Sequence, residues 1–205
     1  MKIQIKDGNF TPPEKDRTDI KFRDFISTIK IEYKLNCSSK SFLFNLLYPN
    51  YCYKYLFSLR LYEFVRCKRG LYKVLSPFLK YRVHRLSYKT KIEIPLFTVG
   101  YGLKINHTTG GIVVNSRARI GRYCCLSNGV IIGQDNIYKP NNVPTIGDNV
   151  HFAPNAKVFG KVSIGNNVII GTDTIIMKSV PDNCSVVGNP ARIVRQNGVK
   201  CNITL

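Results

Sequence analysis

Acidic residues are scarce in this 205-residue chain, which carries 31 Lys and Arg side chains against 12 Asp and Glu and has a formal net charge of +19. The imbalance is sharpest within 54–91, where eleven basic residues and many Tyr and Phe side chains accompany a single acid, Glu63. Such a segment favours an anionic neighbour, either lipid headgroups or a polyanionic substrate. No recognised nucleic-acid-binding motif accompanies the charge, so we expect no specific DNA or RNA partner.

Long hydrophobic runs, a secretory leader and paired metal-binding cysteines are also missing. The most apolar stretch, 41–61, is interrupted by Asn, Pro, Lys and Arg, which argues against a membrane-spanning helix. Residues 1–21 place no apolar stretch behind their first positive charges, so they do not look like a secretory signal. None of the seven cysteines belongs to a CxxC pair, which argues against zinc. We expect reduced thiols and a cytoplasmic protein, with peripheral attachment to the inner face of the membrane left open.

What the sequence does have is a six-residue repeat over its second half. Its fifth position is small or branched in most hexads, and its second is often Gly or Ala. Apolar residues recur in the first position, at Val99, Ile105, Val114, Ile120, Leu126, Ile132, Ile146, Phe152, Val158, Ile164, Ile170 and Ile176. A period of six predicts short strands joined by tight turns, with three hexads closing one triangular coil. An ordinary β-sandwich, the alternative, does not explain a phase kept over six consecutive hexads.

Two interruptions of the repeat are the candidates for a site. The step from Ile105 to Val114 is nine residues and passes through INHTTGGIV. The step from Ile132 to Ile146 is fourteen, which equals two hexads and two extra residues, and it contains the polar segment QDNIYKPNNVPT. A solenoid that expels a loop at a coil corner usually does so for binding, because a regular corner has little with which to hold a ligand.

The helical spacing of apolar residues ahead of the repeat predicts two or three short helices, broken near Pro49, Gly70 and Pro77. Their rims of Tyr, Lys and Arg fit helices that lie on a membrane surface through 54–91, and a basic cap packed on the end of the solenoid is the alternative. The chain is thus expected to comprise a partly irregular N-terminal segment (1–40), a basic, aromatic-rich helical region (41–92), the solenoid (93–194) and a C-terminal tail (195–205).

These features resemble the hexapeptide-repeat acyltransferases, and more narrowly the serine acetyltransferase branch with its relatives in capsular-polysaccharide and O-antigen clusters. The resemblance rests on IPLFTVGYGLKINHTTGGIVV (94–114), the hexads of 118–133 and 146–181, and VVGNPARIV (186–194), which cover about half of the chain. It implies a mostly β fold, namely a left-handed parallel β-helix with a short N-terminal α-helical region. It also implies a homotrimer with acetyl-CoA as donor substrate, and no metal, in a groove between adjacent subunits.

The resemblance also implies the catalytic residue. His107, preceded by GYGLKIN, corresponds to the family's histidine base, and an imidazole suits removal of a hydroxyl proton during attack on a thioester. A backbone N–H near Gly110–Gly111 or Gly133 would stabilise the oxyanion. Glu93 is the nearest carboxylate that could orient His107.

The positions that match the family's acetyl-CoA site are mostly small residues, together with two cations. They are Gly133, Ala153, Pro154, Gly171, Thr172, Lys178, Gly188, Pro190 and Arg192. Small side chains on one outer edge would let the pantetheine lie against backbone amides, and Lys178 and Arg192 would meet the nucleotide phosphates. His84 and His151 lack the pattern around His107 and are expected to be structural or surface residues.

The acceptor is where this sequence departs from the serine acetyltransferases. Ile92 and Asn106 stand where that family carries aspartates, and Asn142-Val143 replaces an Arg-His pair in the extended loop. A zwitterionic amino acid would find no carboxylate for its ammonium, whereas Asn106, Asn141 and Asn142 suit neutral hydroxyls. The sequence therefore predicts O-acetylation of a sugar hydroxyl in a surface polysaccharide, such as capsule or O-antigen, or in its precursor.

Alternatives from two classes stay open. Within enzymes, the alternative is the serine O-acetyltransferase of cysteine biosynthesis. Outside enzymes, the chain would be a non-catalytic solenoid scaffold or a polyanion-binding protein.

Overall fold

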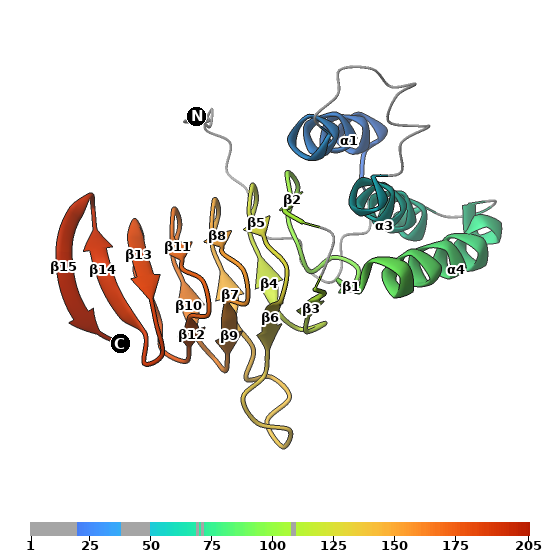
Figure 1. Cartoon of the computed structure of the whole chain (residues 1–205). Helices are drawn as coiled ribbons and strands as arrows, with labels where there is room; N and C mark the ends of the chain where they lie inside the picture. Colours follow the sequence, from blue (N-terminus) through green and yellow to red (C-terminus); the bar gives the residue numbers. More distant parts are fainter. Residues whose placement is uncertain (1–19, 38–49, 69, 71, 108–109) are drawn as a thin grey trace.

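The structure, a computed structural model, describes residues 20–37, 50–68, 70, 72–107 and 110–205, and within them it shows a triangular β-prism with helices at its N-terminal end (Figure 1). The prism is a stack of coils whose strands are two to four residues long and lie on three faces. Up to residue 176, successive strands of the chain lie on different faces, and each pairs in parallel with strands of the neighbouring coils. The six-residue repeat has therefore folded into the predicted parallel β-helix.

Each face is one sheet. The first face holds β1 (Ile92–Glu93), β3 (Ile112–Val114), β6 (Val130–Gly133), β9 (Lys157–Phe159) and β12 (Ile175–Ile176). The second holds β4 (Arg119–Ile120), β7 (Thr145–Ile146) and β10 (Ser163–Ile164). The third holds β2 (Lys104–Ile105), β5 (Cys125–Leu126), β8 (His151–Phe152), β11 (Ile169–Ile170), β13 (Cys184–Val187), β14 (Arg192–Gln196) and β15 (Val199–Thr204).

The inward residues are those that the hexads predict. Regular coils pair residues eighteen apart, as in His151 with Ile169 and Lys157 with Ile175. All twelve first-position residues are buried, and so are the small or branched fifth-position residues, such as Ala118, Val150, Val168 and Val180. Stacking thus buries one continuous aliphatic column, and backbone groups of each coil are paired with the next.

Both interruptions leave the prism as loops at its edges. The step of nine adds three residues to a coil, because Lys104 pairs with Cys125, 21 positions later. The step of fourteen adds eight, because Cys125 pairs with His151, 26 positions later. The interpretation of this second step as two hexads and two extra residues is wrong. Residues 134–143 form one protruding loop between β6 and β7, since their Pro and Asn residues supply no inward aliphatic side chain (Figure 1).

The C-terminal end is closed by an antiparallel hairpin. Residues 195–205, predicted as a tail, contain β15 and the end of β14, and β14 pairs antiparallel with both β13 and β15. Asn197 and Gly198 form the turn with φ values of 49° and 84°, the conformation that an Asn-Gly pair adopts in a two-residue hairpin. This dipeptide is the signal that the prediction of a tail overlooked.

Helices α1 (Phe22–Asn36), α3 (Tyr51–Cys67) and α4 (Tyr72–Thr90) lie at the other end of the prism. Asn50 caps α3, its side-chain oxygen accepting a hydrogen bond of 3.0 Å from the Tyr53 N–H. The predicted apolar face of this helix is buried, with Leu56 and Leu59 in the core of the prism. Helix α3 therefore covers the first coil, as the predicted cap would.

Helix α4 differs from the prediction in two ways. It runs unbroken through Pro77, which lies exposed in the second turn, where a proline removes one hydrogen bond but its ring meets only solvent. Of the apolar residues predicted to define its packing face, Leu79 is buried, whereas Val74, Leu75 and Phe78 are exposed. In the described part of the chain, no helix is both long and apolar enough to cross a membrane.

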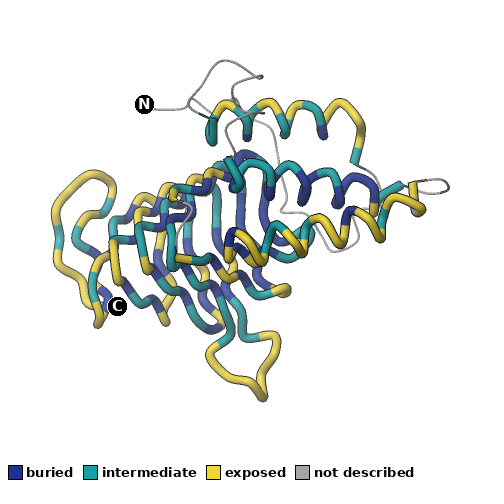
Figure 2. Tube along the Cα trace, turned by 45° about the vertical axis from the view of Figure 1, so that its right-hand side comes forward, coloured by how far each residue is buried: buried dark blue, intermediate teal, exposed yellow. Residues whose placement is uncertain are grey.

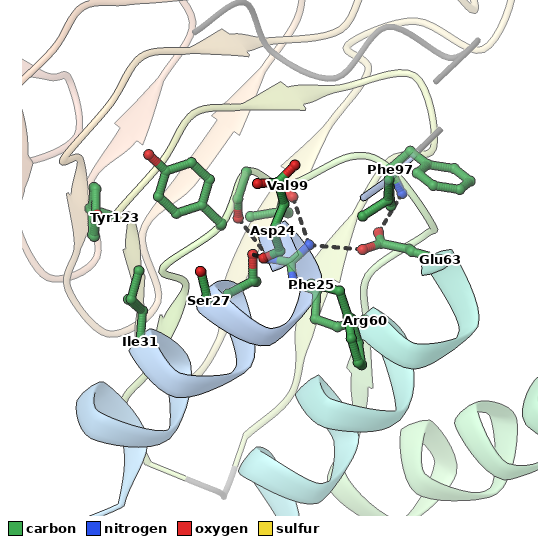
Figure 3. A pocket seen from close by; sticks show the side chains of 13 residues that line it. Asp24, Phe25, Ser27, Ile31, Arg60, Glu63, Phe97, Val99 and Tyr123 are labelled. Carbon is green, nitrogen blue, oxygen red and sulfur yellow. Dashed lines mark hydrogen bonds and ion pairs between the residues drawn. The ribbon is translucent and has the colours of Figure 1, made fainter. Parts of the chain in front are cut away.

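A buried arginine ties α1 and α3 to the first coil. Arg60 of α3 forms an ion pair of 2.8 Å with Glu32 of α1, and its guanidinium donates to the carbonyl oxygen of Gly100. It also forms an ion pair of 3.0 Å with Glu63 and donates to the carbonyl oxygen of Val99 (Figure 3). Burial alone would lower the pKa of Arg60, but the two carboxylates outweigh it and raise the pKa. Burial raises the pKa of Glu32, and the charge of Arg60 opposes that rise.

We expect Arg60→Ala to lower the free energy of unfolding by about 3–5 kcal/mol, because it leaves two carboxylates buried without their cation. Urea denaturation followed by circular dichroism measures the change. Arg66→Ala, at an exposed position of the same helix, serves as the control and should stay within about 0.5 kcal/mol of the parent. An unchanged midpoint for Arg60→Ala would contradict the role assigned to this cluster.

Candidate active site

His107 lies exposed at the corner where the chain passes from the third face to the first. Its φ is 64°, a left-handed conformation that is uncommon for a residue other than glycine. In the next coils the left-handed residue of this corner is Gly129, Asn155 or Asp173, each three positions after the inward residue of the strand. His107 comes only two positions after Ile105, so at this corner the left-handed turn begins one residue earlier than in the regular coils.

The corners below His107 form one continuous edge, which we call the His107 edge. Ile105, Leu126, Phe152, Ile170 and Val186 pair successively across the third face. The residues two positions after them therefore stack in the same place, one per coil: His107, Asn128, Pro154, Thr172 and Gly188. Four predicted site residues, His107, Pro154, Thr172 and Gly188, thus share a single register, and Ala153 and Gly171 lie one position before it.

Small residues keep this edge flat. Ala153 and Gly171 are half-buried, and their N–H groups donate to Ile170 and Val186 of the following coil. A Cβ on Gly171 would come within 2.9 Å of a Val187 methyl, so the chain's own packing requires glycine there. These are the residues assigned to a pantetheine from the sequence, and that assignment stays a prediction.

Two glycines complete the corner that carries His107. Gly110 and Gly111 have φ values of 104° and 71°, which glycine adopts readily. The Gly111 carbonyl accepts a hydrogen bond of 2.7 Å from the N–H of Gly129, and a Cβ on Gly110 would lie 3.1 Å from the Asn128 side-chain nitrogen. Asn128 is a site neighbour that the sequence prediction missed. Asn128 comes 21 residues after His107, which is one regular coil of eighteen residues plus the three inserted ones. This spacing could have predicted that the two residues are neighbours.

A second group of predicted residues lies on a different edge, the loop edge, between the first and second faces. Gly133 ends β6, Asn141 and Asn142 belong to the loop 134–143, and Lys178 follows β12. Asn141 and Lys178 are exposed and Asn142 is half-buried. A Cβ on Gly133 would make only ordinary contacts, at 3.5 Å from the Phe159 ring, so packing within the chain does not require this glycine. Because the loop edge and the His107 edge are different edges of the prism, the two groups do not meet within one chain.

The third edge, between the second and third faces, is occupied by the chain's own hydrogen bonds. The Asn149 amide donates to Asn167 at 2.9 Å, and that of Asn167 donates to Asn183 at 3.0 Å. Beside this column, the carboxylate of Asp148 accepts from the N–H and guanidinium of Arg122. These side chains satisfy backbone and side-chain groups of the next coil, which leaves the other two edges as the places for a ligand.

The remaining predicted residues are spread over other places. Asn106 is half-buried, and its amide nitrogen lies 3.0 Å from the Cys125 sulfur. Glu93 lies exposed on the outer side of β1, where it lines a cavity of about 210 Å³ with Lys80 and His84 of α4. No contact between Glu93 and His107 is seen among the described residues, so its orienting role stays a prediction. Pro190 and Arg192 are exposed where the last corner leads into β14.

A larger cavity, of about 450 Å³, lies away from His107, between α1, α3 and the first coil (Figure 3). Arg60, Glu63, Tyr101 and Tyr123 are among its lining residues. Two of its charged groups, Arg60 and Glu63, are paired with each other, as described above. A site on an edge of the prism is an open surface in a single chain. The cavity of about 450 Å³ therefore lies elsewhere than His107.

The other histidines and the adjacent cysteines give no second reactive centre. His151 is half-buried, and burial, aided by the nearby Lys104 charge, lowers its pKa. Cys124 points into the core, where burial raises the pKa of its thiol to about 12, as expected of a packing residue. Among the described residues, no group of three His, Cys, Asp or Glu side chains is placed to hold a metal ion.

Comparisons with known proteins identify similar sequences. A serine acetyltransferase of Synechococcus elongatus is 34% identical over 137 residues, 66% of this chain and 56% of the relative. One from Bacillus pumilus is 35% identical over 139 residues, 67% of this chain and 64% of the relative. The chain thus spans less than two thirds of the length of either relative. A comparison with protein-family models finds no match.

Solved structures give the same neighbours. The serine acetyltransferase of Neisseria gonorrhoeae superposes with a TM-score of 0.63 at 25% identity, over 87% of this chain and 67% of that one. The enzyme of Brucella abortus, solved in complex with coenzyme A, superposes with a TM-score of 0.64 at 23% identity, over 86% and 68%. The left-handed parallel β-helix with short N-terminal helices is thereby confirmed.

These findings correct the narrower predictions. The resemblance to serine acetyltransferases is borne out, whereas nothing supports a place among enzymes of capsule or O-antigen clusters. The predicted polysaccharide acceptor is contradicted, because the similar proteins are named serine acetyltransferases. That prediction rested on the replacements at Ile92, Asn106 and Asn142-Val143, and the likeness over 137 residues carries more information than these few side chains.

Proposed function

We propose that the protein is an acetyl-CoA-dependent serine O-acetyltransferase. The observation that carries the proposal is the 34–35% identity to serine acetyltransferases over a segment that includes two thirds of the chain. The exposed His107, at the one corner with a three-residue insertion above an edge of small residues, supports it independently.

His107 acts as the general base. Its exposed ring can reach a hydroxyl that approaches the edge, and an imidazole can accept the proton as the hydroxyl oxygen attacks the acetyl carbonyl. Negative charge that develops on the carbonyl oxygen requires a fixed N–H donor nearby, and the glycine corner at Gly110–Gly111 is the nearest candidate on the His107 edge. The proton then passes to the leaving thiolate, so no covalent enzyme intermediate is needed.

The acetyl-CoA site combines both free edges. Ala153, Pro154, Gly171 and Thr172 supply the flat surface below His107. Arg192, exposed at the end of the same edge, would meet phosphate groups. Gly133 and Lys178 lie on the loop edge and can join this site only from another copy of the chain.

A trimer in which the His107 edge of one protomer faces the loop edge of its neighbour brings the two groups together. Closed threefold symmetry provides three identical contacts of this kind. The loop 134–143, with Asn141 and Asn142, then reaches the acceptor beside the neighbouring protomer's His107. Each site is thereby built by two subunits.

Uncharged asparagines are the residues proposed to recognise the acceptor, and one of them, Asn106, stands where the relatives carry an aspartate. Amide oxygens of Asn106, Asn141 and Asn142 can accept hydrogen bonds from the serine ammonium, but they carry no charge. The ammonium still donates a charge-assisted hydrogen bond to an amide oxygen, but it gains no Coulomb attraction from an opposite charge there. We therefore expect serine to bind this site more weakly than a site that uses aspartates.

The acceptor is tested by release of coenzyme A from acetyl-CoA. We expect L-serine to stimulate thiol release and to yield O-acetylserine, identified by mass spectrometry, while D-serine and L-alanine do not. L-alanine keeps both charges but lacks the hydroxyl, so it is the matched control. Turnover that no serine concentration stimulates would refute the proposed acceptor.

The base is tested by His107→Ala. We expect kcat to fall by about 10²–10⁴-fold, because the hydroxyl proton loses its acceptor, with little change in the thermal midpoint since the ring is exposed. His84→Ala, at an exposed position on α4, is the control and should retain full activity. Equal activities of the parent and His107→Ala would exclude the mechanism.

The shared site is tested by mixing two inactive variants. His107→Ala and the double variant Asn141→Ala/Asn142→Ala are each expected to be nearly inactive. Because every mixed trimer contains one intact site, refolding an equal mixture should restore about a quarter of the parental activity. Activity that stays at the average of the two variants would show that each site lies within one chain.

A further inference from the structure

The outward face of α4 carries a stripe of large apolar side chains that are mostly exposed. Val74, Phe78, Tyr81 and Tyr88 are 74%, 61%, 62% and 75% exposed. Their spacing of four, three and seven residues places them along one side of the helix. Leu79 and Val83, which pack on α3 and the loop before the first coil, lie on the opposite side.

Exposed apolar side chains lower the solubility of a protein, and these four add little to the packing of the chain because they are mostly exposed. Helix α4 extends away from the prism, and its exposed positions follow one another along its outer side (Figures 1 and 2). An amphipathic surface helix normally turns its apolar residues inward. Here a second apolar face is turned outward, and exposed patches of this kind usually mark an interaction surface.

The charges around the stripe have one sign. Residues 72–90 contain five Lys and Arg and no Asp or Glu. Arg85 lies within the stripe, with Lys80 on one flank and Arg82 on the other, and all three are exposed. The Lys91 ammonium lies 4.4 Å from the centre of the Tyr88 ring, so cation and aromatic ring sit together at the end of the helix.

The apolar stripe and the positive charge together indicate which kind of partner α4 binds. A second copy of the same face would bring two all-basic helices together, which like-charge repulsion opposes. An acidic lipid surface satisfies both features, because aromatic and aliphatic side chains enter the interface while Lys and Arg reach the headgroup phosphates. Nothing in α4 reads base edges, and a nucleic acid would leave the apolar stripe in water.

We infer that α4 is an interfacial anchor through which the protein binds the surface of membranes rich in anionic lipid, without crossing them. The stripe formed by Val74, Phe78, Tyr81 and Tyr88 enters the headgroup region, and the flanking cations bind lipid phosphates. The inference goes beyond the proposed function, since it concerns a helix that supplies no residue to the site around His107.

The test is flotation of the full-length protein with vesicles. We expect binding to vesicles of phosphatidylcholine with about one third phosphatidylglycerol, weak binding to pure phosphatidylcholine, and release as salt is raised, because surface charge is screened. Equal binding to both kinds of vesicle, or to neither, would overturn the inference.

Two pairs of variants separate the apolar and charged contributions. Phe78→Ser/Tyr81→Ser should weaken binding at least about tenfold, whereas Val199→Ser/Ile203→Ser, at exposed apolar positions of β15, should not. Arg85→Glu should weaken binding more than about fivefold, while Lys200→Glu, at an exposed position of β15, should have a much smaller effect. All four should keep the parental acetyl-transfer rate and circular dichroism spectrum, which excludes misfolding.

Two further outcomes would contradict the lipid partner. If Phe78→Ser/Tyr81→Ser reduced the molar mass measured by light scattering and left vesicle binding unchanged, the stripe would be a contact between copies. If a short DNA or RNA duplex displaced the protein from vesicles and bound more tightly than they do, the cations would serve a nucleic acid.

Discussion

Parallel hydrogen bonding between residues eighteen apart is the constraint on which the rest of the structure depends. It fixes which residues stack on each edge, because a residue at a corner can only lie above and below its counterparts in adjacent coils. An inserted residue cannot be absorbed within the sheets without reversing which side chains point inward. Extra residues are therefore expelled at corners, and the two expelled segments become the irregular surface around which a site can be built.

The three edges consequently have different uses. One is filled by Asn149, Asn167 and Asn183, whose amides bond to one another along the stack. The His107 edge is lined by small residues and opens at an irregular corner, and the loop edge carries the longer insertion. A prism cannot bring two of its own edges together, so cooperation between them requires symmetry. The shape of the monomer is thus the physical basis of the proposal that each site is divided between subunits.

The sequence predicted the solenoid almost residue by residue, because a repeat reports its inward positions directly and Ile120, Val158 and Ile170 are all fully buried. It also located His107 and the small residues stacked below it, although their chemistry stays a prediction. What it could not predict depends on contacts between distant segments. Arg60 looked like an interruption of an apolar stretch, and only the positions of Glu32 and Glu63 make it a buried link. Likewise, helical spacing cannot tell which apolar face of α4 is covered.

The antiparallel hairpin at the C-terminal end has a consequence for the history of such a chain. Because β14 runs against β13, a further parallel coil has no strand of the right direction to continue from at that end. The stack can lengthen only by duplication of an internal eighteen-residue unit, and the terminal reversal would be carried along unchanged. Growth of the protein in evolution is thereby restricted to its interior, and each added coil would move the closing hairpin one layer farther from His107.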